Sequence, residues 1–157
     1  MEINWNAISA IATSVSALAV IFAMLQLRLT KRVSQLQFED SLAKEYRELA
    51  GRIPPKALLG GKLSRDEYKR TYDELFHYID LSNEQCMLRS QGRVNRQVWI
   101  SWSQGIETNL KLQAFEQVWT DVKGRTENFR ELRELEKDFS KDPFKGGFWA
   151  WIRTGNY

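Results

Sequence analysis

Residues 7–27 read AISAIATSVSALAVIFAMLQL, and no Asp, Glu, Lys or Arg occurs between Ile3 and Leu27. At about 1.5 Å of rise per residue, a helix of this length covers the roughly 30 Å hydrocarbon core of a bilayer. The stretch therefore predicts a transmembrane helix over 7–27, preceded by a short N-terminal segment, 1–6. Everything that follows in the chain is then tethered to a membrane.

The flanks of this run predict how the helix is retained and oriented. A cleavable signal peptide needs a basic N-terminal region, but the chain starts with Met1 and Glu2 and the apolar run continues past the Ala-x-Ala triplet at 17–19. No Lys or Arg precedes the run, and three basic residues follow it: Arg28, Lys31 and Arg32. The positive-inside rule places such residues at the cytoplasmic headgroups. We therefore expect a single-pass protein of the bacterial inner membrane, with its N-terminus outside and its C-terminal domain in the cytoplasm.

Small residues lie along one side of the predicted membrane helix. They repeat at spacings of three and four: Ser9, Ala12, Ser16, Ala19, Ala23 and Gln26. Bulky residues follow a parallel line about 100° around the helix. Small residues let helix backbones approach closely, and Ser or Gln can hydrogen-bond across the contact, so this side predicts a homo-oligomer through the membrane helices. The alternative is a monomeric anchor in which Ala and Ser are merely tolerated.

The helix is expected to continue beyond the bilayer. Over 28–50 the chain has no Gly or Pro, and its apolar residues keep helical spacing. We predict a juxtamembrane helical stalk over 28–51, with Gly51 as its stop. The apolar phase slips where Glu39 and Asp40 fall, so a kink or break there is the alternative to one continuous helix.

The remaining residues, 52–157, predict a compact all-α cytoplasmic domain. Apolar residues recur at helical spacing, and no segment alternates with the period of two that marks a strand. After a connector with room for one helical turn, capping residues and glycines bound four expected helices, at about 65–89, 96–110, 113–122 and 127–139. Gly105 inside the second costs about 1 kcal/mol relative to Ala, so we expect another helix to approach closely there.

The C-terminal tail, 144–153, places three large aromatic residues beside basic ones. It either docks into the helical core or a neighbouring subunit, or lies in the headgroup region of the membrane.

Charge and cysteine content point to the same setting. The 23 basic residues nearly balance the 20 acidic ones, and the net charge of +3 suits an anionic lipid surface without requiring nucleic acid. No duplex nucleic acid is expected as a partner. Cys86 is the single cysteine, so there is no disulfide framework, as in domains that face the reducing cytoplasm.

The sequence offers poor material for catalysis. His77 is the single histidine, and Cys86 lies nine residues after it in the same expected helix. At this spacing the two side chains do not face each other, so they do not form a nucleophile and base pair. No cluster of His, Cys, Asp and Glu has metal-ligand spacing. We therefore expect no catalytic residue, no metal and no cofactor.

A basic turn is the better candidate for a binding site. Arg89, Arg93 and Arg96 lie around Gly92, and Trp99 follows. Arginines provide forked donors for phosphate, and aromatic faces can stack on a base, so the turn predicts an anionic nucleotide-like ligand or an acidic protein partner. The alternative is a solvated basic turn over a Trp-lined core.

The opening at 4–12, NWNAISAIA, resembles that of a loosely defined group of small bacterial proteins of unknown function. Their helical domains carry short motifs similar to those in this chain: Tyr78-Ile79, Asn83-Glu84, Gly92-Arg93-Val94, Trp99, Trp102, Phe115 and Trp119. The likeness spans most of the chain and implies an anchor followed by a helical domain, with no catalytic residue to carry over. By layout alone the chain is also similar to membrane effectors of bacterial anti-phage systems, including those of type III CRISPR systems that bind cyclic oligoadenylates.

These observations favour a non-enzymatic signalling or defence effector. In this hypothesis the cytoplasmic domain binds a ligand or protein, and oligomeric membrane helices respond. The alternative from another class is a passive scaffold that recruits a cytoplasmic partner to the membrane, and a membrane-bound enzyme comes third.

Overall fold

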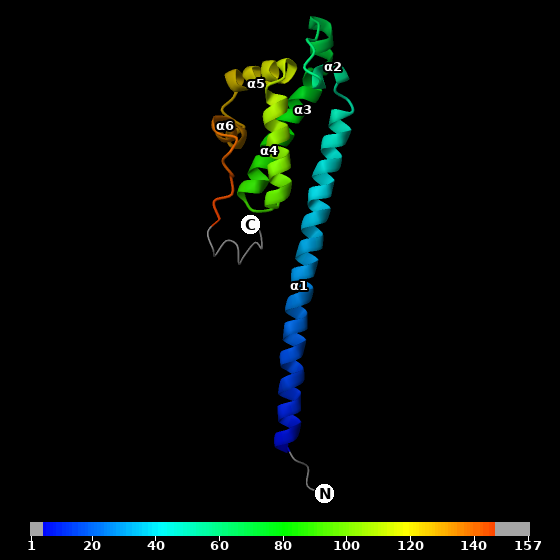
Figure 1. Cartoon of the computed structure of the whole chain (residues 1–157), viewed down its shortest axis with the longest axis vertical. Coiled ribbons are helices and arrows are strands. Elements are labelled where there is room, and N and C mark those ends of the chain that lie inside the picture. The colour runs from blue at the N-terminus through cyan, green and yellow to red at the C-terminus, as the bar shows by residue number, and fades with distance from the viewer. Residues whose placement is uncertain (1–4, 147–157) are drawn as a thin grey trace. The chain divides into compact units, whose positions relative to one another are not determined.

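The computed structural model describes residues 5–146, and all of its regular structure is helical (Figure 1). The helices are α1 (Trp5–Ala50), α2 (Pro55–Leu58), α3 (Arg65–Ser90), α4 (Arg96–Leu110), α5 (Gln113–Arg125) and α6 (Arg130–Lys137). No strand occurs in the part of the chain that the structure describes. The all-α prediction is confirmed. The predicted N-terminal segment through Asn4 and the aromatic tail from Gly147 lie outside the described residues.

The chain divides into two compact units, Met1–Phe38 and Glu39–Tyr157. Helix α1 belongs to both, because it runs without interruption from Trp5 to Ala50 and then ends before Gly51. The prediction that the helix continues beyond residue 27 is confirmed, and the break near Glu39 that was its alternative does not occur. The folded unit begins at Glu39, whereas the sequence placed the start of the domain at residue 52. The last thirteen residues of the predicted stalk, 39–51, thus belong to the same unit as the domain.

The first unit is a helix whose described side chains have little protein around them. Its large apolar residues are exposed, several by more than half of their surface: Val15, Leu18, Val20, Ile21, Phe22, Met24, Leu25 and Leu27. Within the described residues, α1 is the one helix long and apolar enough to cross a membrane. Such a helix needs an apolar environment that the single chain does not provide.

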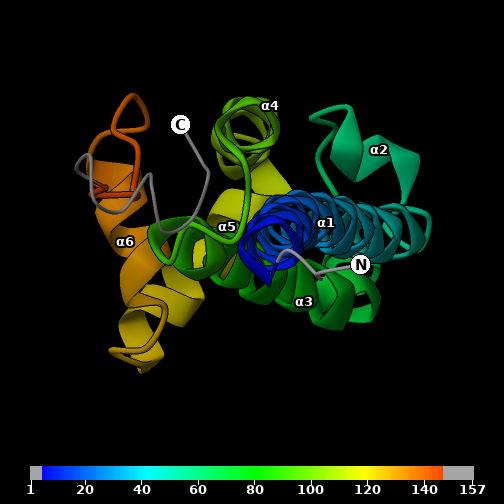
Figure 2. The ribbon, with the colours of Figure 1, turned by 90° about the horizontal axis from the view of Figure 1, so that it is seen from below.

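The second unit is a small helical domain centred on α3 and α5. Helix α3 packs against α5 and α6, and both α2 and α4 pack against α5, while α2 and α6 lie at opposite sides of the domain (Figures 1 and 2). Apolar stripes of these helices meet in a core that includes Leu75, Ile79, Ile106, Phe115, Val118, Trp119, Leu132 and Leu135. These are mostly the periodic apolar positions of the sequence, so binary patterning accounts for the core.

The C-terminal end of α1 is built into this core. Leu42 and Leu49, seven residues apart on one side of the helix, are buried, and the ring of Tyr46 lies 6.2 Å from that of Tyr78. Glu39 is buried as well, and its Oε1 accepts a hydrogen bond from the backbone N–H of Asn95 at 2.6 Å. Glu39 therefore ties α1 to the start of α4, at the place where the slip in the apolar phase had left a break as the alternative.

Replacing Glu39 with alanine should destabilise the domain by about 2 kcal/mol, because a buried hydrogen bond to a charged group is lost and the Asn95 N–H loses an acceptor. The adjacent Asp40 is exposed and provides a matched control. Urea unfolding of the full chain in detergent micelles, followed by Trp fluorescence, measures both variants. Equal midpoints for Glu39→Ala and Asp40→Ala would contradict this role.

Capping residues set the ends of the central helices as the sequence indicated. Ser64 and Glu67 form a reciprocal capping box at the start of α3, and the Asn95 side chain accepts the Val98 N–H at the start of α4. The Ser64 N–H, together with Lys56, lowers the pKa of Glu67 to about 2. Between the two helices, Gly92 has a φ of 70°, a conformation that glycine adopts without strain.

Two expectations about the later helices are wrong. Helix α6 covers Arg130–Lys137 rather than 127–139, because Phe129 takes a left-handed conformation with φ 63° and the backbone before it is not helical. The Phe129 ring accounts for this conformation, since it packs edge-on against both Phe76 and Trp119. Gly105 faces open space, and a Cβ added there would meet nothing within 4 Å. No helix approaches it closely.

Candidate functional site

The basic turn around Gly92 points one of its arginines inward. Arg89 is only 1% exposed, and its guanidinium binds both carboxylate oxygens of Asp142, at 2.8 Å from Nε and 2.5 Å from Nη2. Its Nη1 donates to the Val94 carbonyl at 2.8 Å, and the Phe144 ring lies 5.0 Å away. Arg89 thus holds the segment after α6 onto the end of α3. An external ligand does not reach this guanidinium without displacing Asp142.

The electrostatics of Asp142 agree with this internal pairing. Burial on its own raises the pKa of this carboxyl, but the bonds from Arg89 and from the Phe144 N–H, together with the charges of Arg89 and Arg96, outweigh burial and hold the pKa below its ordinary value. Asp142 is therefore ionised at neutral pH and neutralises part of the basic turn. The positive charge there is smaller than the sequence suggested.

The other members of the predicted site divide between surface and core. Arg93 and Arg96 are exposed, while Trp99 is 3% exposed and belongs to the core under the turn. The structure brings Arg96 close enough to act on Asp142, but it does not place the four residues around a common opening. The arrangement matches the alternative reading, a basic turn over a Trp-lined core, more closely than a stacking site.

The predicted contact face of the membrane helix is exposed in the single chain. Five of its six residues are exposed: Ser9, Ser16, Ala19, Ala23 and Gln26. The sixth, Ala12, has a side chain that the structure does not describe. The described bulky residues, Val15, Leu18, Phe22, Leu25 and Leu29, are exposed as well. So are the basic residues that follow: Arg28, Lys31 and Arg32. The small-residue face and the headgroup residues remain predictions.

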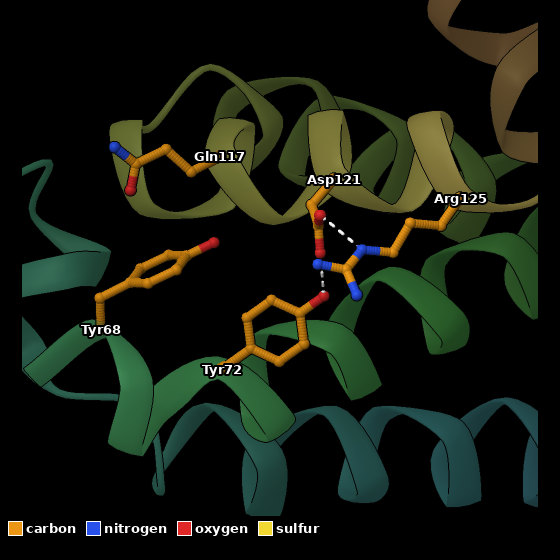
Figure 3. Close-up of a pocket in the computed structure, with 5 residues that line it drawn as sticks. All are labelled: Tyr68, Tyr72, Gln117, Asp121 and Arg125. Carbon is orange, nitrogen blue, oxygen red and sulfur yellow. Dashed lines mark hydrogen bonds and ion pairs between the residues drawn. The ribbon is translucent and has the colours of Figure 1, made fainter. Parts of the chain in front are cut away.

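A second site, which the sequence did not single out, lies between α3 and α5. A pocket of about 470 Å³ opens to solvent there, lined by Tyr68, Tyr72, Gln117, Asp121 and Arg125 (Figure 3). The two tyrosines come from successive turns of α3, and the other three residues from successive turns of α5. Helix packing brings the two rows of side chains together.

A hydrogen-bonded triad organises one side of this pocket. The Tyr72 hydroxyl donates to Oδ2 of Asp121 at 2.5 Å, and Nε of Arg125 donates to Oδ1 at 2.6 Å. The Tyr68 ring stands edge-on to that of Tyr72, with centroids 6.0 Å apart (Figure 3). Both carboxylate oxygens of Asp121 are thus occupied, which fixes the phenol and the guanidinium relative to each other.

Ionisation in the pocket follows from these contacts. The bonds from Tyr72 and Arg125 hold the pKa of the Asp121 carboxyl below its ordinary value, and the bond to Asp121 is the main cause that raises the pKa of Tyr72 to about 12. Partial burial, with the Asp121 charge, raises the pKa of Tyr68. At neutral pH the pocket therefore holds neutral phenols, one carboxylate and one guanidinium.

Replacing Tyr72 with phenylalanine should remove one late-titrating phenol. The pKa values of Tyr72 and Tyr78 are both raised to about 12, Tyr78 mainly by burial. A raised folded-state pKa means that the Tyr72 bond stabilises the fold fully below the ordinary value, about pH 10, and that this stabilisation is lost as pH rises towards 12. Ultraviolet titration of phenolate absorbance in the full chain should show one fewer phenol ionising near pH 12 in Tyr72→Phe than in the wild type.

Asp121→Asn should lower the pKa of the Tyr72 phenol, because the bond to the Asp121 carboxylate is the main cause that raises it. Glu116→Gln changes an exposed residue on the same helix and should leave the titration unchanged. A Tyr72→Phe titration that overlays the wild type would contradict the assignment.

Sequence reasoning missed this pocket for a specific reason. Tyr68 and Tyr72 have helical spacing with the buried Leu75 and Ile79, a pattern typical of core positions, although both tyrosines are only partly buried. The i, i+4, i+8 spacing of Gln117, Asp121 and Arg125 was the available signal, because it places three polar side chains on one side of a helix. That spacing is common on solvated faces, and it becomes a site only when α3 packs beside it.

The residues most often used in catalysis are not arranged for it in the described part of the chain. Cys86 is fully buried, and burial raises the pKa of its thiol far above the ordinary value. A thiol in that state is a poor nucleophile. His77 is exposed on the same helix. Among the described residues, no group of three or more His, Cys, Asp or Glu side chains could hold a metal ion.

Comparison with known proteins adds no further constraint: no protein-family model, curated protein or solved structure matches the chain.

Proposed function

We propose that this chain is a non-enzymatic membrane-anchored signalling or defence effector. Its helical domain binds a cytoplasmic ligand or protein and passes the change to the membrane through α1. The observation that carries the proposal is that one helix serves both units: α1 holds the apolar stretch, and its last twelve residues, from Glu39, pack into the domain. A change in packing around Leu42 or Leu49 therefore acts on the helix that would enter the bilayer.

Exposure of the apolar stretch supports the membrane part of the proposal. Exposed apolar surface costs roughly 25 cal/mol per Å² relative to burial, and the first unit exposes eight large apolar side chains between Val15 and Leu27. A bilayer removes this cost. The basic residues after the run support an N-terminus outside and a domain in the cytoplasm of a bacterial inner membrane.

The small-residue side of α1 supports an assembly of several copies. A chain with one membrane helix can bury that side only against another copy or another membrane protein. We propose a homo-oligomer through Ser9, Ala12, Ser16, Ala19, Ala23 and Gln26. Light scattering of the full chain in detergent should give a mass of two or more chains, and a mass of one chain would overturn this part.

The effector proposal is tested by membrane potential. We expect overproduction of the full chain to depolarise bacterial cells, measured with a potential-sensitive dye. The triple variant Ala12→Leu, Ser16→Leu, Ala19→Leu should lose the effect, because bulky side chains block close packing of the helices. Replacement of residues 7–27 by an unrelated membrane helix should also abolish it.

The chain offers a matched control for these substitutions. Ala10, Ser14 and Ala17 have the same composition and lie roughly 160° away around the helix. The triple variant Ala10→Leu, Ser14→Leu, Ala17→Leu should retain depolarisation. Equal loss in both triple variants would contradict a specific contact face. A chain that causes no depolarisation and keeps its partner with an unrelated anchor would instead be a passive scaffold.

A further inference from the structure

The pocket between α3 and α5 has features of a ligand site beyond the hydrogen-bonded triad of Tyr72, Asp121 and Arg125. Its volume, about 470 Å³, falls within the range of small-molecule sites. It combines an aromatic wall, an amide and a guanidinium from two rigid helices, as Figure 3 shows. We propose that this pocket binds a nucleotide-like ligand, meaning a small molecule with one planar ring and one anionic group.

The guanidinium is the group that would hold the anion. Arg125 uses Nε to bind Asp121, and its side chain is 75% exposed, so its Nη groups are accessible to a ligand. A guanidinium offers paired N–H donors that match a phosphate or carboxylate. Because Asp121 is itself held by Tyr72, the guanidinium is oriented before any ligand arrives. Such preorganisation lowers the entropy cost of binding.

The net charge of the pocket limits the kind of anion. The charges of Asp121 and Arg125 cancel, so the pocket offers one oriented guanidinium and little net positive charge. One phosphate or carboxylate group fits this arrangement. A polyanion would gain little from it, since its further charges would meet no further cation among the lining residues.

The aromatic and amide groups would hold the planar part of the ligand. Tyr68 presents a partly buried ring at the pocket, and Gln117 lies one helical turn before Asp121 with an exposed amide (Figure 3). A base stacked on an aromatic ring gains about 1–3 kcal/mol, and an amide can donate to and accept from a base edge. The spacing of the three α5 residues then puts the base near Gln117 and the anion near Arg125.

A neighbouring pocket extends the polar surface. It has a volume of about 350 Å³ and shares Gln117, with a lining from the same helix: Gln113, Glu116, Gln117 and Thr120. This second pocket lies on the side of Gln117 away from Arg125, so its amides, carboxylate and hydroxyl offer polar contacts to the edge of the ring rather than to the part of the ligand between the ring and the anion.

This assignment names the ligand class and site of the proposed function, and it rests on the proposal that the domain binds a ligand. It also moves the predicted nucleotide site away from the basic turn. There, Arg89 already binds Asp142 and Trp99 is buried, whereas the guanidinium and amide of the α3–α5 pocket are exposed.

Titration calorimetry of the full chain in detergent micelles tests the assignment. The probes are the four common nucleoside 5′-monophosphates, with the nucleosides and inorganic phosphate run separately. We expect at least one monophosphate to bind, and its nucleoside and inorganic phosphate each to bind about tenfold or more weakly, since each lacks half of the contacts. Saturation by none of the four, or equal binding by phosphate alone, would overturn the proposal.

Variants locate the binding. Arg125→Gln and Gln117→Ala change exposed side chains, so both should fold, which circular dichroism checks, and each should weaken binding about tenfold. Arg130→Gln, an exposed arginine outside the pocket, is the matched control and should bind as the wild type does. Undiminished binding by Arg125→Gln and Gln117→Ala would overturn the assigned site. The depolarisation and mass measurements use no ligand, so failure here is distinguishable from failure of the membrane proposal.

Discussion

Replacing Asp142 with alanine should lower the free energy of unfolding by about 3 kcal/mol, because it leaves the buried Arg89 charge without its partner. Breaking a buried pair costs about 3–5 kcal/mol, and the lower end applies because Asp142 is 31% exposed and water can reach the vacated space. Urea unfolding of the full chain in detergent micelles, followed by Trp fluorescence, measures the change.

A double-mutant cycle separates the pair from its surroundings. Arg89→Met with Asp142→Ala leaves no unpaired buried charge, so the double variant should lose less stability than the sum of the single variants. Asp138→Ala, an exposed carboxylate in the same segment, is the control. Additive losses would show that the contact between Arg89 and Asp142 contributes nothing of its own.

Acid should remove the same stabilisation. The folded-state pKa of Asp142 is depressed, so its contribution is present above the ordinary carboxyl value and is lost as pH falls through the lower folded value. The wild type and Asp142→Ala should therefore converge in stability below about pH 4. A constant difference from neutral pH to pH 2 would contradict the pairing as its cause.

Replacing Phe115 with alanine should lower the free energy of unfolding by about 4 kcal/mol, because it opens a cavity where the core helices meet. Phe115 is 0% exposed, and its ring stands edge-on to that of Tyr78 at 4.9 Å between centroids. Loss of this ring removes burial and an aromatic pair together. Circular dichroism of the full chain during urea unfolding in detergent micelles measures the loss.

The matched control for the core is Ile100→Ala. Ile100 is 43% exposed on α4, so its truncation should cost well under 1 kcal/mol. Phe115→Leu keeps most of the volume and should fall between the two. A cost for Phe115→Ala no larger than that for Ile100→Ala would contradict the central place of Phe115 in the core.

The position at which the folded unit begins decides how α1 is joined to the domain. Had the domain started at residue 52, a connector would have separated it from α1. Its start at Glu39 makes the last turns of α1 part of the domain instead. The Glu39 bond to Asn95 and the buried Leu42 then join α1 to the rest of the fold.

Local sequence patterns predicted the structural features that depend only on nearby residues, such as helix periodicity and helix ends. The helical periodicity of α3, the Ser64 capping box and the stop at Gly51 were readable, because each involves residues within one or two turns. The inward position of Arg89 was also readable in principle. It continues the buried series Leu75, Ile79, Ser82, Cys86 at spacings of three and four, and only its charge suggested the surface.

Contacts between distant residues were not readable. Asp142 lies 53 residues from Arg89, and nothing in the local sequence of either residue specifies the other. The left-handed Phe129 is decided by rings from α3 and α5, so the start of α6 was misplaced. Gly105 carried a local signal for close packing that the arrangement of helices does not use.

By itself, the sequence determined that this is an all-α chain with a membrane-length apolar helix, because periodicity, length and capping are properties of contiguous residues. Only the tertiary structure decided which charges are internal and which residues share a pocket. Arg89, a ligand candidate in the sequence, is the partner of Asp142, and Tyr72, which the sequence did not single out, is the partner of Asp121. Both pairs join residues that are far apart in the sequence, so they form only when the chain has folded.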